Sequence, residues 1–179
     1  MNSAQEKKLI ESCIKGKSKA QRALYDQFSP KMYALCLRYA KDQDQATEML
    51  QTGFIKVFEK LGQYKFQGPL GAWIRRIILN NAINIIKAEN KFNNVTIDSS
   101  ECEFVLVTEE NVDQKLDSTQ IECAINNLRE DYRTVFNLHC IEELSHKEIS
   151  ELLEIKETTS RSWLRRAKEE LREKLQEIF

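Results

Sequence analysis

The chain has 179 residues, 41% hydrophobic and 31% charged, with only 5 Gly and 2 Pro, which suits one helical domain or two small ones. It contains no run of about 18 apolar residues, which excludes a membrane-spanning helix, and residues 1–10 lack the apolar segment of a signal peptide. The 5 cysteines, with no CxxC pair, and the 2 histidines support neither a disulfide framework nor a zinc site. We therefore expect buried thiols in a reducing cytoplasm, no metal and no cofactor.

The net charge of −1 conceals an uneven distribution along the chain. Residues 1–91 carry 16 basic and 8 acidic residues (+8), residues 92–118 carry 1 and 7 (−6), and residues 119–179 carry 10 and 13 (−3). The basic first segment indicates a polyanionic partner, and the acidic middle segment indicates a linker. In the last segment, a contact with nucleic acid must come from a local cluster of cations.

Residues 1–91 are expected to form a compact bundle of about four helices. The first long apolar stripe contains Pro30, which is expected to break or kink it. Asp42 or Asp44 can cap the next helix. The apolar residues of that helix repeat at i, i+3, i+4 and i+7; they are Ala46, Met49, Leu50, Phe54, Val57, Phe58 and Leu61.

A break from Gly62 to Gly71, which also contains Gly68 and Pro69, precedes a second strong stripe. This stripe consists of Leu70, Trp73, Ile74, Ile77, Ile78, Ala82, Ile85 and Ile86. Residues 92–118 then lose the helical pattern and are expected to be a flexible connector, in which Phe104–Val107 is a short extended piece or an anchor.

From Ser118 the helical pattern resumes and predicts a separate helical domain over 119–179. Ser145 and Glu148 have the spacing of a capping box, in which a hydroxyl and a carboxylate satisfy two backbone amides at a helix start. A short turn through 154–156 leads to a last helix. Its inward residues are expected to be Leu164, Ala167, Leu171 and Leu175.

Two helices joined by a tight turn, the second rich in arginine, are typical of a helix-turn-helix whose second helix enters the major groove. The candidate DNA-binding residues are Arg161, Ser162, Arg165, Arg166 and Lys168. Arginine can pair with guanine through two hydrogen bonds and can also bind phosphate. The alternative is an ordinary solvated face, which three arginines within six residues disfavour. For Trp163, core packing is favoured over a contact with a partner or with DNA.

Three runs together resemble the extracytoplasmic-function sigma factors of the sigma-70 family. The run LSHKEISELLEIKETTSRSWLRRAKEELREKL (144–175) resembles their domain that reads the −35 promoter element. The run ALYDQFSPKMYALCLRYAKDQDQATEMLQTGFIKVFEKL (23–61) resembles the start of their promoter-melting domain. The run FQGPLGAWIRRIILNNAINIIK (66–87) is similar to their part that recognises the −10 element. Two separate matching domains around a linker make a specific resemblance.

The resemblance implies that the helix from Asp44 to Leu61 docks on the β′ coiled coil of RNA polymerase. The polar residues expected to make this contact are Glu48, Gln51, Thr52 and Lys56, with Leu50 and Phe54 near the margin. Thr52 stands where the family usually has an acidic residue. The alternative is an ordinary solvated helix face.

The resemblance also implies that the loop before the last helix of the first domain captures an unstacked −10 base. Its candidate residues are Tyr64, Lys65, Phe66 and Gln67, since aromatic and polar groups can hold a base out of the stack. The alternative is that Tyr64 and Phe66 seal the bundle.

On the following helix, polar residues are expected to face away from the apolar stripe and to bind DNA: Arg75, Arg76, Asn80, Asn81 and Asn84. Trp73 lies within the stripe, so we expect it to pack in the core. In the second domain, Glu154 stands where the family often has glycine; a left-handed conformation there costs on the order of 1 kcal/mol. Ser160 stands where the family usually has an apolar residue.

We therefore expect an all-α, non-enzymatic sigma factor that binds core RNA polymerase (β′ coiled coil and β flap) and promoter DNA. The expected domains are a promoter-melting and −10 domain (1–91), an acidic linker (92–118) that threads toward the RNA channel, and a −35 domain (119–179). An anti-sigma protein remains open as a further partner. The alternatives are a stand-alone helix-turn-helix regulator with a sensing and dimerising bundle, and an enzyme such as a recombinase. Residues 1–91 lack the clustered Ser or Tyr, acids and arginines of strand cleavage.

Overall fold

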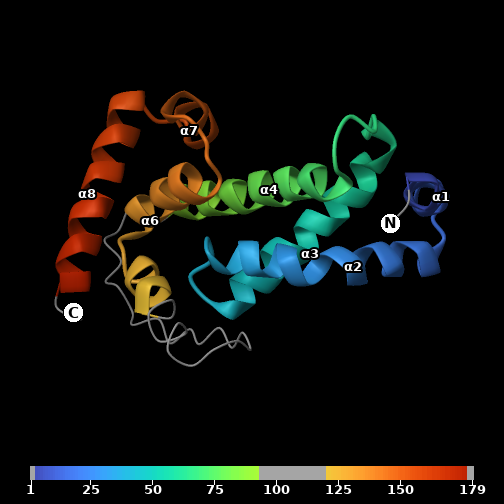
Figure 1. Ribbon diagram of the computed structural model, residues 1–179, viewed down its shortest axis with the longest axis horizontal. Helices are drawn as coiled ribbons and strands as arrows, with labels where there is room; N and C mark the ends of the chain where they lie inside the picture. Colours follow the sequence, from blue (N-terminus) through green and yellow to red (C-terminus); the bar gives the residue numbers. More distant parts are fainter. Residues whose placement is uncertain (1–2, 93–119, 177–179) are drawn as a thin grey trace. The chain divides into compact units, whose positions relative to one another are not determined.

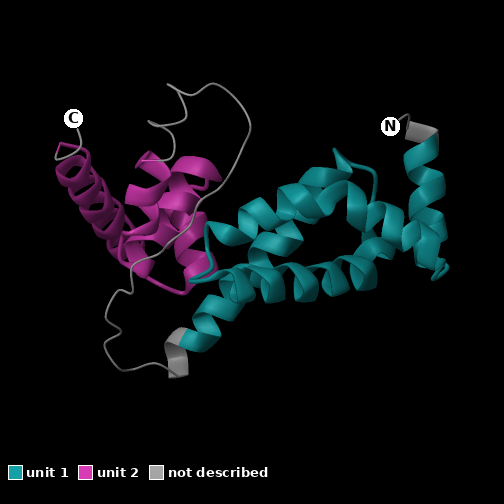
Figure 2. Ribbon diagram, turned by 90° about the horizontal axis from the view of Figure 1, so that it is seen from below, with its two compact units in different colours: residues 1–92 teal, residues 93–179 magenta. Residues whose placement is uncertain are grey.

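The computed structural model describes residues 3–92 and 120–176, and every regular element in these ranges is a helix, which confirms the expected all-α class. The chain divides into two compact units, Met1–Phe92 and Asn93–Phe179, coloured teal and magenta in Figure 2. Apart from Phe92, the expected connector and its Phe104–Val107 segment lie outside the described ranges. No helix within those ranges combines the length and apolarity needed to cross a membrane.

Within residues 3–92, the first unit contains four α-helices, which are labelled in Figure 1, and one 3-10 turn. They are α1 (Ser3–Ile14), α2 (Ser18–Leu37), α3 (Gln43–Lys60), η1 (Leu61–Gln63) and α4 (Leu70–Phe92). Helix α3 packs against both α2 and α4. The apolar stripes predicted for α3 and α4 supply much of the core, which includes Ala46, Met49, Phe54, Val57, Leu61, Ile74, Ile78 and Ile86. Full burial of such a side chain contributes roughly 1.5–3 kcal/mol.

Helix α3 begins at a side-chain cap. The Asp42 carboxylate accepts a hydrogen bond of 2.7 Å from the backbone N–H of Gln45, so Asp42 rather than Asp44 is the capping residue. This bond satisfies one of the backbone donors that a helix start leaves without an intrahelical partner.

Helix α2 continues through Pro30, so of the expected break or kink, the break is wrong. Proline removes one helical hydrogen bond and disfavours a helix interior by about 3 kcal/mol. Buried residues lie on both sides of it, with Leu24 before and Met32, Leu35 and Cys36 after. The burial of these side chains outweighs the local cost of the proline.

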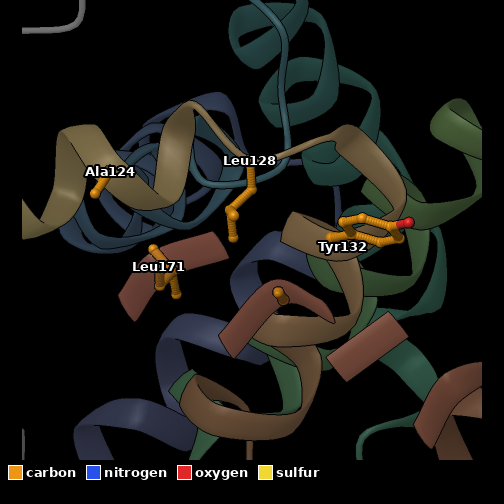
Figure 3. Packing of buried hydrophobic residues seen from close by; sticks show 5 residues of the cluster. Ala124, Leu128, Tyr132 and Leu171 are labelled. Carbon is orange, nitrogen blue, oxygen red and sulfur yellow. The ribbon is translucent and has the colours of Figure 1, made fainter. Parts of the chain in front are cut away.

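The second unit contains a helix over residues 120–126, α6 (Glu130–Phe136), a π-helical segment η2 (Asn137–Ile141), α7 (His146–Leu153) and α8 (Glu157–Gln176). Figure 3 shows the apolar cluster of this unit, to which the helix over residues 120–126, α6 and α8 all contribute. The cluster consists of Ala124, Leu128, Tyr132, Ala167 and Leu171. Trp163 packs against it, which confirms the packing role expected for that residue.

The capping box predicted at the start of α7 is confirmed. Ser145 Oγ accepts from the backbone N–H of Glu148 at 3.2 Å, and the Glu148 carboxylate accepts from the backbone N–H of Ser145 at 2.8 Å. At its other end, α7 stops at Glu154, which has the left-handed conformation considered from the sequence (φ 57°, ψ 40°). A side chain with a Cβ is strained there, whereas glycine is not.

A hydrogen bond that sequence reasoning missed joins α7 to α8. His146 Nδ1 and Ser160 Oγ lie 2.9 Å apart, and the His146 ring stacks on that of His139 with centroids 4.6 Å apart. Ser160 is fully buried, so this partner accounts for a polar residue at an interior position. Burial lowers the pKa of His146, and His139, Arg161 and Lys168 lower it further, while Glu157 acts in the opposite direction.

The expectation of buried thiols is confirmed for only some of the cysteines in the described ranges. Cys13 and Cys36 are buried, and burial raises the pKa of Cys36 to about 12. Cys123 and Cys140 are exposed, so the expectation is wrong for these two. A cysteine has no fixed place in a helical pattern, and its burial depends on which face of its helix is covered. Cys102 lies outside the described ranges.

We predict that the second unit loses stability as the pH falls below about 6.5, the ordinary pKa of histidine. The folded state holds the pKa of His146 below that value, so the unfolded chain binds the proton more readily. This contribution is fully present above the unfolded pKa and is lost as the pH falls toward the folded pKa. Hydrogen exchange of the α7 and α8 amides at about pH 7.5 and pH 5.5 measures it. His146→Asn, which keeps a polar side chain but does not titrate, should show a smaller loss; equal losses would contradict the prediction.

We predict that Glu154→Gly stabilises the second unit by about 0.5–1 kcal/mol, because glycine removes the strain of the left-handed conformation. The matched control is Glu151→Gly, at an exposed position inside α7, which should destabilise by about 1 kcal/mol through its helix propensity. Urea denaturation, monitored through hydrogen exchange of the α7 and α8 amides, measures the stability of the two variants. A loss of stability in both variants would show that the turn does not strain Glu154.

Candidate nucleic-acid interface

A pocket of about 400 Å³ opens where the loop after η1 meets the start of α4. Its lining consists of Gln63, Tyr64, Lys65, Gln67, Gly68, Pro69, Ala72, Trp73 and Arg76. The structure thus brings three of the four predicted loop residues together with an arginine and a tryptophan of α4. The volume lies within the range of small-molecule sites in proteins.

Tyr64 forms the inner wall of this pocket. It is 8% exposed, its hydroxyl donates to the Gly68 carbonyl at 2.6 Å, and its ring packs on Trp73 with centroids 5.4 Å apart. Burial raises the pKa of the Tyr64 hydroxyl, and the nearby carboxylate of Glu6 adds to the effect. Tyr64 therefore shapes the pocket, and Trp73 is half-buried beside it rather than inside the core.

Phe66 behaves differently from Tyr64. It is 48% exposed and has a positive φ of 58°, so it does not seal the bundle. Its ring lies 4.9 Å from the Tyr64 ring, centroid to centroid. A bulky residue with positive φ is strained, and such residues cluster at binding and catalytic sites. The loop holds an aromatic face available to a partner.

One side of α4 continues from the pocket as a polar row. At 100° per residue, Trp73, Arg76, Asn80, Asn84 and Lys87 fall on the same side of the helix. Arg76, Asn80 and Asn84 are exposed and Lys87 is half-buried. Arg75 is also half-buried but does not fall on this side of the helix. The exposed amides and guanidinium match the donors and acceptors of base edges and phosphates.

Asn81 does not belong to this row, so its assignment as a DNA-facing residue is wrong. It is 2% exposed, and its amide nitrogen donates to the Met49 carbonyl at 3.0 Å and to Thr52 Oγ1 at 2.7 Å. The sequence carried a signal for this position. Asn81 follows Ile74 by seven residues and Ile78 by three, which places it on the apolar stripe.

The outer face of α3 carries Glu48 and Gln51 exposed, with Lys56 half-buried. Thr52, also half-buried, accepts a hydrogen bond from Asn81 of α4 and therefore belongs to the contact between the helices rather than to the docking face. Leu50 and Phe54, expected near the margin of this face, are buried, because α3 is covered on two sides by α2 and α4. The exposed apolar residue on the face is instead Ile55, which is 57% exposed. Sequence reasoning missed Ile55, although it follows Glu48 by seven residues and Gln51 by four, the spacing of one helix face.

On α8, all five predicted DNA-binding residues are exposed: Arg161, Ser162, Arg165, Arg166 and Lys168. Helical geometry places Arg161, Arg165 and Lys168 on one face. Arg161 pairs with Glu157 at 3.3 Å and Arg165 with Glu169 at 3.8 Å. Exposed pairs of this kind contribute about 0–1 kcal/mol, so a polyanion can displace the carboxylates.

Ser162 and Arg166 lie off that face. The Ser162 hydroxyl donates to the Thr159 carbonyl at 3.2 Å, and the Arg166 guanidinium donates to the Tyr132 hydroxyl at 3.1 Å. This hydrogen bond raises the pKa of Arg166. Within the described ranges, no group of three or more His, Cys, Asp or Glu is placed to hold a metal ion.

Comparison with known proteins gives a consistent result. The family model Sigma-70 region 2 matches residues 24–92, and the model Sigma-70, region 4 matches residues 118–171. The chain is 26% identical to the RNA polymerase sigma-H factor of Pseudomonas aeruginosa, over 98% of this chain and 96% of that one. It is 28% identical to the ECF RNA polymerase sigma factor SigW of Bacillus subtilis, over 96% of this chain and 97% of that one.

The fold is shared with a solved sigma factor, RpoE from Bartonella quintana, in its complex with the anti-sigma factor NepR. That match has a TM-score of 0.56 at 18% identity and covers 87% of this chain and 96% of the other. Together, the two sigma-70 regions and the relatives matched along nearly the whole chain show that this protein belongs to the extracytoplasmic-function (ECF) sigma factors of the sigma-70 family.

Proposed function

We propose that this ECF sigma factor directs core RNA polymerase to promoters through three surfaces. The outer face of α3 docks on the polymerase, the pocket and polar row of α4 hold opened −10 DNA, and α8 reads the −35 element. The observation that carries the proposal is the continuity of the pocket with the row Arg76, Asn80 and Asn84 along one side of α4. A pocket for one unstacked base beside a row of donors and acceptors suits a melted strand.

In the second unit, α7, the turn at Glu154 and α8 form a helix-turn-helix in this proposal. Helix α8 lies in the major groove, and Arg161 and Arg165 near its N-terminal end reach base edges or phosphates. Residues 1–91 serve as the melting domain and residues 119–179 serve as the −35 domain.

The acidic residues 92–118 connect the two domains, and their charge of −6 suits a segment that imitates nucleic acid in the RNA channel of the polymerase. The chemistry of RNA synthesis belongs to the polymerase, so we assign no catalytic residue to this chain. An anti-sigma protein as a further partner rests on family membership alone. The stand-alone regulator is not favoured, because both sigma-70 regions match.

Run-off transcription with core polymerase tests the function. The wild-type chain should confer initiation at specific start sites, and Glu48→Ala/Gln51→Ala should require more protein for the same yield, because it removes polar contacts from the docking face. A matched control is Glu11→Ala/Gln27→Ala, an exposed acid and amide away from this face, which should behave as wild type. If the wild-type chain confers no initiation, the proposal fails. If Glu48→Ala/Gln51→Ala docks as well as the control variant does, the assignment of the docking face to α3 fails.

The −35 assignment predicts that Arg161→Ala and Arg165→Ala each weaken binding to promoter duplex by about 1–3 kcal/mol if the side chain reads a base. A phosphate contact would instead weaken binding to all sequences and lower the salt dependence. Arg172→Ala is the control, since Arg172 lies on the same face of α8 but farther from the N-terminal end. Holoenzyme binding to promoter fragments with intact and altered −35 elements measures the effect. Wild-type affinity in both variants would overturn the assignment of α8.

A further inference from the structure

Helices α3 and α4 approach each other closely at Gly53. A Cβ added at Gly53 would lie 2.6 Å from Ile78 Cδ1 and 3.5 Å from Asn81 Nδ2. Ile78 is fully buried, so the space around it is filled. The absence of a side chain at Gly53 lets the two backbones come together, and any axial shift of one helix on the other changes these contacts.

A buried hydrogen-bonded group lies at the same crossing. The Asn81 amide nitrogen donates to Thr52 Oγ1 and to the Met49 carbonyl, both on α3. The Thr52 hydroxyl in turn donates to the Glu48 carbonyl at 2.7 Å. The side chains of Asn81 and Thr52 are therefore engaged between the helices.

Stability alone does not account for a polar pair at this position. Burying an amide costs free energy of desolvation, and the hydrogen bond that the amide then makes recovers only about the same amount. A protein with apolar groups of the same shape in their place is often equally stable or more so. A hydrogen bond, however, requires one alignment of donor and acceptor, while apolar surfaces tolerate sliding. Buried asparagines fix the register of coiled coils at a cost in stability.

The pair joins the two helices that carry two of the proposed surfaces. On α3, Thr52 follows Gln51, which is on the docking face; on α4, Asn81 follows Asn80, which is on the DNA-binding row. The position of the row relative to the polymerase therefore depends on how α4 sits on α3. Binding groups must be held within roughly 0.5 Å of their working geometry to be effective.

We propose that Asn81 and Thr52 are positioning residues that fix the axial register of α4 on α3, so that docking through α3 places the row of α4 correctly on the melting promoter. This inference rests on the proposed function. It gives Asn81 a role behind the DNA-binding surface rather than on it.

The test replaces both partners by apolar residues of similar shape, Thr52→Val/Asn81→Leu, in the full chain. Thermal unfolding should occur at an equal or higher temperature, because no polar group is left unpaired. Opening of a promoter that the wild-type holoenzyme opens should nevertheless be slower by roughly threefold to thirtyfold. The rate is measured by permanganate reactivity of unpaired thymines at saturating core polymerase, so that differences in docking affinity do not contribute.

The control is Thr52→Ser, which keeps the hydroxyl and loses a methyl group, and should open the promoter at nearly the wild-type rate despite a lower unfolding temperature. A purely structural role predicts that opening follows stability in all variants. Wild-type opening by a folded double variant would overturn the proposal. If the double variant does not fold, Thr52→Val against Thr52→Ser decides, with slower opening expected only for valine. A wild-type chain that opens no promoter would instead refute the proposed function.

Discussion

The close crossing of α3 and α4 is the constraint on which the first unit depends. Gly53 brings the two helices together, and the buried amide of Asn81 bonds across the crossing to Thr52. Each helix therefore has one face committed to the other and an opposite face free for a partner. In the proposed function, these outward faces bind polymerase and DNA. The packing of α3 on α4 therefore sets the position of the DNA relative to the polymerase.

In the second unit, a single helix has both a face packed in the core and a face exposed to a partner. On α8, Ala167 and Leu171 enter the apolar cluster, while Arg161, Arg165 and Lys168 lie on the exposed face. The carboxylates paired with the two arginines belong to the same helix and are exposed, so they reduce the local positive charge without holding the guanidinium groups tightly. Such a surface stays soluble when free and can exchange its ion pairs for phosphates, with a strong dependence on salt.

The pocket at the start of α4 differs from both of these surfaces because a loop shapes it. Tyr64 is held by its bond to the Gly68 carbonyl and by Trp73, while Phe66 lies exposed with a positive φ. A rigid wall beside a strained, exposed aromatic residue combines a fixed shape with a face on which a base can stack.

The sequence by itself determined the elements whose cause is local. Helical periodicity, the Ser145–Glu148 capping box and a helix cap at Asp42 or Asp44 follow from residues within a few positions of each other. The structure decided for Asp42 and for the left-handed conformation of Glu154. The arginine cluster on α8 was found because its three arginines lie within six residues, although helical spacing then places only Arg161, Arg165 and Lys168 of the five candidates on one face.

Only the tertiary structure decided which faces are covered and by what. Leu50 and Phe54 are buried because α3 has neighbours on two sides, and Asn81 is buried because its partner Thr52 is 29 residues earlier in the chain. The continuity of α2 through Pro30 and the pairing of His146 with Ser160 also depend on packing between elements. Periodicity relates residues of one helix to each other, but burial and hydrogen bonding between helices depend on how distant segments pack.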